Sequence, residues 1–215
     1  MIKKKLSENI LIFCAHSDDE IVGMGATIPK YVQEGKKVIV VIFSFGEKSH
    51  PHYKEEIISQ IRLKETKHID RFIGRKSLFF GLTEGRIKEE AEKFKIDKRI
   101  ESLINYFKPT KIFTLSELDP HPDHRAVHEV VVKTLNKIKY KGDLYAFEVW
   151  NIVNENKPVM YVDISDTFDL KLRTLKQFRS QWLSIYLLWI PVYIRARLNG
   201  LKNNCKYAEK FYKLK

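Results

Sequence analysis

Short, uninterrupted apolar runs that alternate with helical segments constrain this chain more than any other feature. Asn9–Ala15, Lys37–Ser44 and Lys111–Leu115 are almost entirely apolar and too short for helices, which is typical of strands buried on both faces of a parallel sheet. Strands that alternate with helices pack as a parallel sheet between two helical layers, with right-handed crossovers. The sequence therefore predicts an α/β fold, a Rossmann-like three-layer sandwich with a mostly parallel sheet flanked by helices.

Weaker patterns complete this alternation. Further strands are predicted at Ser77–Phe80, Asp143–Val149 and Val159–Val162. Amphipathic spacing predicts the connecting helices, at Asp18–Gln33, Lys54–Ile73, Lys88–Phe107, Asp123–Ile138 and Ser165–Ser180. No internal repeat and no linker rich in Gly, Pro or Ser divides the chain. We expect a single domain over residues 1–215, with an aromatic and basic C-terminal segment at about 182–215.

Composition places the chain among globular proteins of a reducing compartment. Hydrophobic residues make up 44% of the sequence, and no stretch reaches the roughly 20 apolar residues of a membrane-spanning helix. The basic start at Met1–Ile10 has no apolar core of a signal peptide. Two cysteines, Cys14 and Cys205, cannot form a disulfide framework. We expect a cytoplasmic protein, with peripheral membrane contact left open.

The net charge of +12 is concentrated near the C-terminus. Arg195–Lys215 holds seven basic residues and one acidic residue, Glu209, and so supplies half of the total. A solvated lysine-rich surface accounts for such a charge. The non-enzymatic alternative is a basic module that binds nucleic acid, although that function has no use for the polar clusters described next.

Two polar clusters follow predicted strands, where open parallel sheets bind their ligands. Ala15–Glu20 reads Ala-His-Ser-Asp-Asp-Glu and follows the first strand, and Asp119–His124 reads Asp-Pro-His-Pro-Asp-His and follows Lys111–Leu115. Helix capping explains one or two residues of the first cluster, and a polar surface loop is the alternative for the second. Taken together, they form a nitrogen and oxygen ligand set with room for an open position, which is typical of catalytic zinc.

These residues resemble the two signature motifs of the LmbE-like, or PIG-L, family of zinc-dependent N-acetylglucosaminyl deacetylases. The family's usual forms are Ala/Pro-His-Pro-Asp-Asp-Glu and His-Pro-Asp-His, so Ser17 stands where proline is usual. Weaker similarities extend over most of the chain, at Arg62–Glu65, Phe80–Gly85, Ser180-Gln181 and Tyr207–Glu209.

The resemblance implies that His16, Asp19 and His124 bind the metal. Zinc is the expected ion, with Fe²⁺ or another divalent ion as the alternative. Zinc held by two His and one Asp keeps coordination sites for water and for the amide oxygen, and lowers the pKa of bound water towards roughly 7.

The resemblance also implies the catalytic roles. Asp18 would be the general base, and His121 would polarise the scissile carbonyl and stabilise the oxyanion. Asp123 would orient His121 and keep it protonated. Arg62 would contact substrate, with an ordinary helix-surface salt bridge as the alternative. Because Ser17 lies between ligands, we expect the turn geometry to differ there. Either Asp18 or His121 could protonate the departing amine.

The implied reaction removes the N-acetyl group of an N-acetylglucosamine-containing substrate and releases acetate. The alternatives are a deacetylase or amidase of low-molecular-weight thiol glycosides, and a deacetylase of a lipid-linked N-acetylglucosamine. The natural acceptor and the oligomeric state, a homo-oligomer included, are left open.

Two other features had more than one interpretation. The uncharged, aromatic run Trp182–Ile194 is predicted to be a core helix broken at Pro191, or an interfacial segment resting on an anionic membrane. His50 and His52 lie in a loop after the second strand, which predicts a solvated loop, a rim over the site, or a second metal site.

Overall fold

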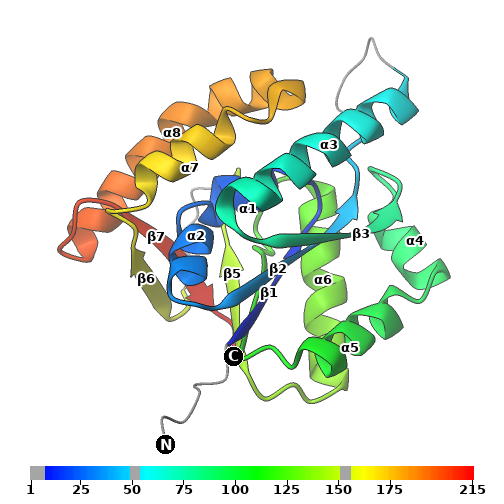
Figure 1. The fold of residues 1–215 in the computed structure, drawn as a ribbon. Coiled ribbons are helices and arrows are strands. Elements are labelled where there is room, and N and C mark those ends of the chain that lie inside the picture. Colours follow the sequence, from blue (N-terminus) through cyan, green and yellow to red (C-terminus); the bar gives the residue numbers. More distant parts are fainter. Residues whose placement is uncertain (1–7, 49–53, 151–155) are drawn as a thin grey trace, which may run out of the picture.

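One mixed sheet organises the molecule (Figure 1). The computed structural model describes residues 8–48, 54–150 and 156–215. Its seven strands lie in the order β3-β2-β1-β4-β5-β7-β6. They are β1 (Asn9–Cys14), β2 (Lys37–Ser44), β3 (Lys76–Leu82), β4 (Lys111–Leu115), β5 (Asp143–Phe147), β6 (Val159–Asp163) and β7 (Ala208–Lys213). Strands β1 to β5 are parallel to one another, and β7 is antiparallel to both β5 and β6. The predicted α/β sandwich is confirmed.

Helices cover both faces of the sheet (Figure 1). They are α1 (Asp19–Met24), α2 (Thr27–Gln33), α3 (Glu55–Ile73), α4 (Ile87–Lys93), α5 (Ile96–Phe107), α6 (Pro122–Lys137), α7 (Phe168–Leu175) and α8 (Trp182–Lys202), with a 3₁₀ turn at Arg179–Gln181. Right-handed crossovers put α1, α2 and α3 on one face and α4, α5 and α6 on the other. The order in which strands are added reverses between β1 and β4: β2 and β3 follow on the side of β1, and β5 follows on the side of β4. The carboxyl ends of β1 and β4 therefore form the topological switch point, where open α/β sheets bind their ligands.

Two predicted helices are each two helices in the structure. The first breaks between Met24 and Thr27, at Gly25 and Ala26. Gly23, in the last turn of α1, lies so close to the Phe147 ring that an added Cβ would be 2.3 Å from it. Lys88–Phe107 breaks at Lys95, whose φ of 49° is left-handed and cannot continue a helix. Amphipathic spacing continues across both breaks, so periodicity alone could not locate them.

The C-terminal segment departs furthest from the prediction. α8 is one helix of 21 residues that continues through Pro191, where a break was expected. No helix among the described residues combines the length and hydropathy needed to cross a bilayer. The basic end of the chain also forms the unpredicted strand β7, which inserts between β5 and β6.

A buried ion pair anchors β7 to the helical layer. The Glu209 carboxylate accepts hydrogen bonds from the backbone N–H groups of Ala26 and Thr27, at 3.2 and 2.8 Å. It also pairs with Lys171 Nζ of α7 at 2.6 Å, and both side chains are 4% exposed. Glu209 thus joins β7, α7 and the start of α2, which gives the Tyr-Ala-Glu sequence a structural role.

We predict that Glu209→Ala destabilises the protein by about 3–5 kcal/mol, because it leaves a buried lysine charge and two backbone donors without their acceptor. Urea unfolding followed by circular dichroism measures this change. As a control, Glu101→Ala removes an exposed pair with Lys98 and should cost under about 1 kcal/mol. Equal effects of the two substitutions would contradict this role for Glu209.

Candidate active site

Three side chains named from the sequence converge beyond the carboxyl ends of β1 and β4. His16 and Asp19 follow β1, and His124 lies in the first turn of α6, which follows β4. One ligand atom from each residue lies within 4.8 Å of the other two, and all three residues are buried. Two imidazoles and a carboxylate at this spacing could hold one divalent cation.

Asp19 fixes the turn that follows β1. Its Oδ2 accepts hydrogen bonds from the backbone N–H groups of Ala15 and His16, at 3.0 and 2.8 Å, while Oδ1 lies 3.1 Å from His124 Nε2. Burial opposes the charge of Asp19, but the imidazoles of His124 and His16 outweigh it and hold the pKa of Asp19 well below its usual range. Asp18 occupies the N-cap of α1 without a side-chain capping bond, so helix capping does not account for it.

His124 lies between two carboxylates. Its Nδ1 is 2.9 Å from Asp119 Oδ1 and its Nε2 is 3.1 Å from Asp19 Oδ1, yet neither nitrogen has a hydrogen bond of good geometry within the described part of the chain. Burial disfavours a charged imidazole, but Asp19 and Asp119 outweigh it and raise the pKa of His124 to about 10. The cluster is therefore strongly attractive to a cation, which fits a bound metal ion.

Asp123 occupies a different place from the one predicted. Its Oδ2 lies 3.3 Å from His16 Nε2 and accepts a hydrogen bond from the Gly85 N–H at 2.8 Å. The contact with His121 comes instead from the backbone N–H of Asp123, which donates to His121 Nδ1 at 3.1 Å. The carboxylate of Asp123 thus supports His16, and its main chain orients His121.

This hydrogen bond also defines the form of His121. Because Nδ1 accepts, the neutral ring carries its hydrogen on Nε2 and presents a donor there. Burial lowers the pKa of His121, and the neighbouring His124 and His16 lower it further. Both observations favour a neutral His121 that donates from Nε2, whereas the resemblance implies a protonated imidazole.

Arg62 is another departure, because it supports Asp18 and is not open to a substrate. The residue is 2% exposed, and its guanidinium donates to Asp18 Oδ1 at 3.0 Å, to Ser17 Oγ at 3.1 Å and to the Gly46 carbonyl at 3.3 Å. Asp18 itself is partly exposed. Ser17, where proline is usual in the resembled motif, supplies a buried hydroxyl that accepts from Arg62.

Two further residues lie at the site, although no role was predicted for them. Asp119 backs His124, as a carboxylate commonly backs a metal-binding imidazole. Glu84 joins His16 and His121 in a second group whose ligand atoms lie within 4.8 Å of one another. Only its position at a strand end could have indicated Asp119. Glu84 lies in the Phe80–Gly85 stretch that is similar to the family, but this similarity did not predict that Glu84 lies near His16 and His121. His50 and His52 lie outside the described residues.

Fold and site together define a class of protein: α/β proteins with a buried His-Asp-His group at the topological switch point of the sheet. A family model described as "PIG-L: GlcNAc-PI de-N-acetylase" matches residues 11–135, more than half of the chain. The chain belongs to this PIG-L family.

Individual relatives agree with this membership. The chain is 27% identical, over 94% of its length and 81% of the relative's, to a diacetylchitobiose deacetylase of Thermococcus kodakarensis. Its fold matches N,N'-diacetylchitobiose deacetylase from Pyrococcus horikoshii, with a TM-score of 0.81 at 23% identity over 98% of this chain and 85% of the other. The fold is equally similar to GalB of Pseudomonas putida, a 4-carboxy-2-hydroxymuconate hydratase, with a TM-score of 0.83 at 20% identity over 97% and 96% of the two chains. Fold alone therefore does not define the reaction.

We predict that Asp119→Asn weakens the affinity of the purified protein for added Zn²⁺ by about 10- to 100-fold, because His124 loses the carboxylate behind Nδ1. Competition with a chromophoric chelator measures the affinity. Glu117→Gln is the control, since it removes an exposed pair with Lys157 two residues away. Equal zinc affinity in the Asp119 variant and the wild type would contradict this supporting role.

Proposed function

We propose that this protein is a zinc-dependent N-deacetylase that hydrolyses the N-acetyl group of an N-acetylglucosamine-containing substrate and releases acetate. The observation that carries the proposal is the buried His16-Asp19-His124 group with a partly exposed carboxylate, Asp18, beside it. Two diacetylchitobiose deacetylases among the similar proteins support an amino-sugar substrate.

The residues present fit the metal. His16, Asp19 and His124 would hold it, and their nitrogen and oxygen atoms are ligands that zinc accepts. The Nε2 of His124, which faces Asp19 and is buried without an aligned hydrogen bond in the described structure, is explained by such an ion. When bound, zinc supplies a Lewis acid and lowers the pKa of a water ligand to about 7.

Asp18 is suited to take a proton from the attacking water. Arg62 engages Oδ1, which leaves Oδ2 to accept the proton. Since the Arg62 guanidinium is itself held by Ser17 and Gly46, the carboxylate keeps a fixed direction without being a metal ligand. Two adjacent carboxylates thereby take separate roles, because Asp19 faces the histidines and Asp18 faces an arginine.

His121 is suited to stabilise the oxyanion. Its Nε2–H can donate to the carbonyl oxygen as negative charge develops there. A donor held by a backbone hydrogen bond needs no reorganisation during the reaction. As the C–N bond breaks, the proton that Asp18 took from the water is available to the nitrogen of the departing amine.

The experiment compares zinc content with acetate release from N-acetylglucosamine conjugates. His124→Ala should lose both zinc and activity. Asp18→Asn should keep stoichiometric zinc while kcat falls by about 10²–10⁴-fold, because the base is lost and the ligands are intact. A thiol-glycoside conjugate, a lipid-linked N-acetylglucosamine and an unsaturated acid, the last testing hydratase activity, complete the substrate panel.

Three results would overturn the proposal. The first is equal acetate release by wild type and Asp18→Asn, and the second is zinc retained stoichiometrically by His124→Ala. The third is hydration of the unsaturated acid without acetate release from any conjugate, which would indicate a hydratase.

A separate prediction concerns Arg62. Arg62→Lys should lower kcat by about 10- to 100-fold with KM and zinc content nearly unchanged, because lysine cannot hold Asp18, Ser17 and Gly46 together and the base loses its direction. Steady-state kinetics with circular dichroism as a folding control measures this. A rise in KM at constant kcat would instead restore the substrate-binding role expected from sequence.

A further inference from the structure

Helix α8 presents a continuous apolar face to the outside of the protein. It forms the outermost layer on its side of the molecule (Figure 1). Nine large apolar residues on this helix are between 43% and 75% exposed. We call them the α8 outer face: Trp182, Leu183, Tyr186, Leu187, Ile190, Tyr193, Ile194, Leu198 and Leu201.

This face is not needed to hold the helix on the protein. Its residues recur at spacings of three and four, so they line one side of the helix. The opposite side, with Ile185, Leu188, Val192 and Ala196, is buried against the rest of the structure. A helix that is apolar on both sides buries both, so the outer face requires a second apolar environment.

An open groove extends the outer face towards α7. Leu175 and Phe178 line it together with Trp182, Tyr186 and Trp189 of α8. Lys176 and Arg179 also line the groove, and Lys176 Nζ lies 5.1 Å from the centre of the Trp189 ring. The groove thus combines apolar side chains, which suit lipid tails, with cationic groups, which suit anionic headgroups.

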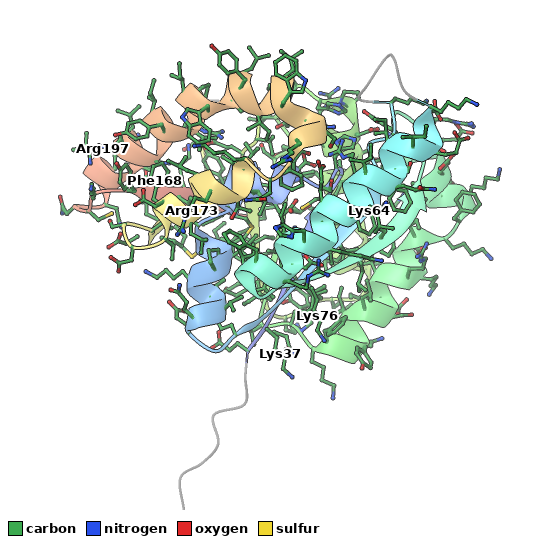
Figure 2. The ribbon with its side chains drawn as sticks, turned by 45° about the horizontal axis from the view of Figure 1, so that its top comes forward. Lys37, Lys64, Lys76, Phe168, Arg173 and Arg197 are labelled. Carbon is green, nitrogen blue, oxygen red and sulfur yellow. The ribbon has the colours of Figure 1, made fainter. Side chains whose placement is uncertain are left out.

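The surrounding charge is almost entirely positive. Residues 168–206 contain eight basic residues and one acidic residue, Asp169, and α8 contains no acidic residue. Arg173, Lys176, Arg179, Lys202 and Lys206 are exposed. Figure 2 places Arg173 of α7 and Arg197 of α8 in the same region of the molecule. The chain carries +12 overall, so a second copy seated on this face would bring like charges together, whereas an anionic surface would attract them.

We infer that the α8 outer face binds the surface of an anionic lipid bilayer, with the helix lying in the plane of the interface. The apolar residues enter the boundary between headgroups and acyl chains. Trp182, Tyr186 and Tyr193 supply amphipathic rings, which favour the interface. The exposed lysines and arginines contact the anionic headgroups.

The residue segment just before the α8 outer face contacts α3, the helix that supports the candidate active site. Ser180, just before α8, donates from its N–H and hydroxyl to the Glu65 carboxylate at 3.0 and 2.6 Å. Glu65 lies three residues after Arg62 on α3, the residue that holds Asp18. The inference itself stands on the α8 surface and does not depend on the proposed reaction.

Sedimentation of the full chain with vesicles tests it. Vesicles of phosphatidylcholine with phosphatidylglycerol should bind the protein at low salt, and pure phosphatidylcholine should bind it at least about 10-fold more weakly. The double variant Leu187→Glu/Ile190→Glu should bind anionic vesicles at least about 10-fold more weakly than wild type, and should remove the blue shift of tryptophan fluorescence on binding. Tyr106→Glu is the matched control, because Tyr106 on α5 is 80% exposed and outside this face.

Three outcomes would overturn the inference. They are no vesicle binding at low salt, equal binding by the double variant and wild type, and a stable oligomer in light scattering that the same double variant dissociates. The last would show that a second copy covers the face. Since Leu187 and Ile190 are exposed, thermal unfolding should confirm that the double variant still folds.

Discussion

The position of the Asp19 carboxylate is the constraint on which the site depends. One of its oxygens accepts the N–H groups of Ala15 and His16, and so shapes the turn at the end of β1. The other faces His124 at the start of α6. A single side chain thus joins the two elements on either side of the topological switch point. Without it, the elements that carry His16 and His124 would lose this link, and the buried backbone donors would lose their acceptor.

Around Asp19, the role of each polar side chain follows from the residue that it contacts. Asp119 lies behind His124, Asp123 lies behind His16, and Arg62 holds Asp18. This pairing explains how adjacent carboxylates coexist in a buried region: one faces imidazoles and the next faces a guanidinium. The proposed division of labour between metal ligand and base follows from these surroundings, and it would disappear if the partners were exchanged.

The sequence predicted the sheet and the location of the site because both follow from local patterns. Apolar runs of strand length gave the parallel core, and strand ends gave the two polar clusters. The pairing inside the site was not predictable, since spacing cannot say that the Asp123 carboxylate meets His16 or that Arg62 turns inward. Strand β7 was missed for a related reason: Glu209 reads as a surface charge until its buried partner from α7 is known.

The account's central claim is that the His-Asp-His group is a metal centre. A crystal structure of the zinc-loaded protein with anomalous data at the zinc edge tests this most directly. The account predicts one strong peak about 2.0–2.2 Å from a nitrogen of His16, an oxygen of Asp19 and a nitrogen of His124, with Asp18 outside bonding distance. A peak held by Glu84 and His121 with the His-Asp-His group empty would contradict it. So would the absence of any peak near the carboxyl ends of β1 and β4.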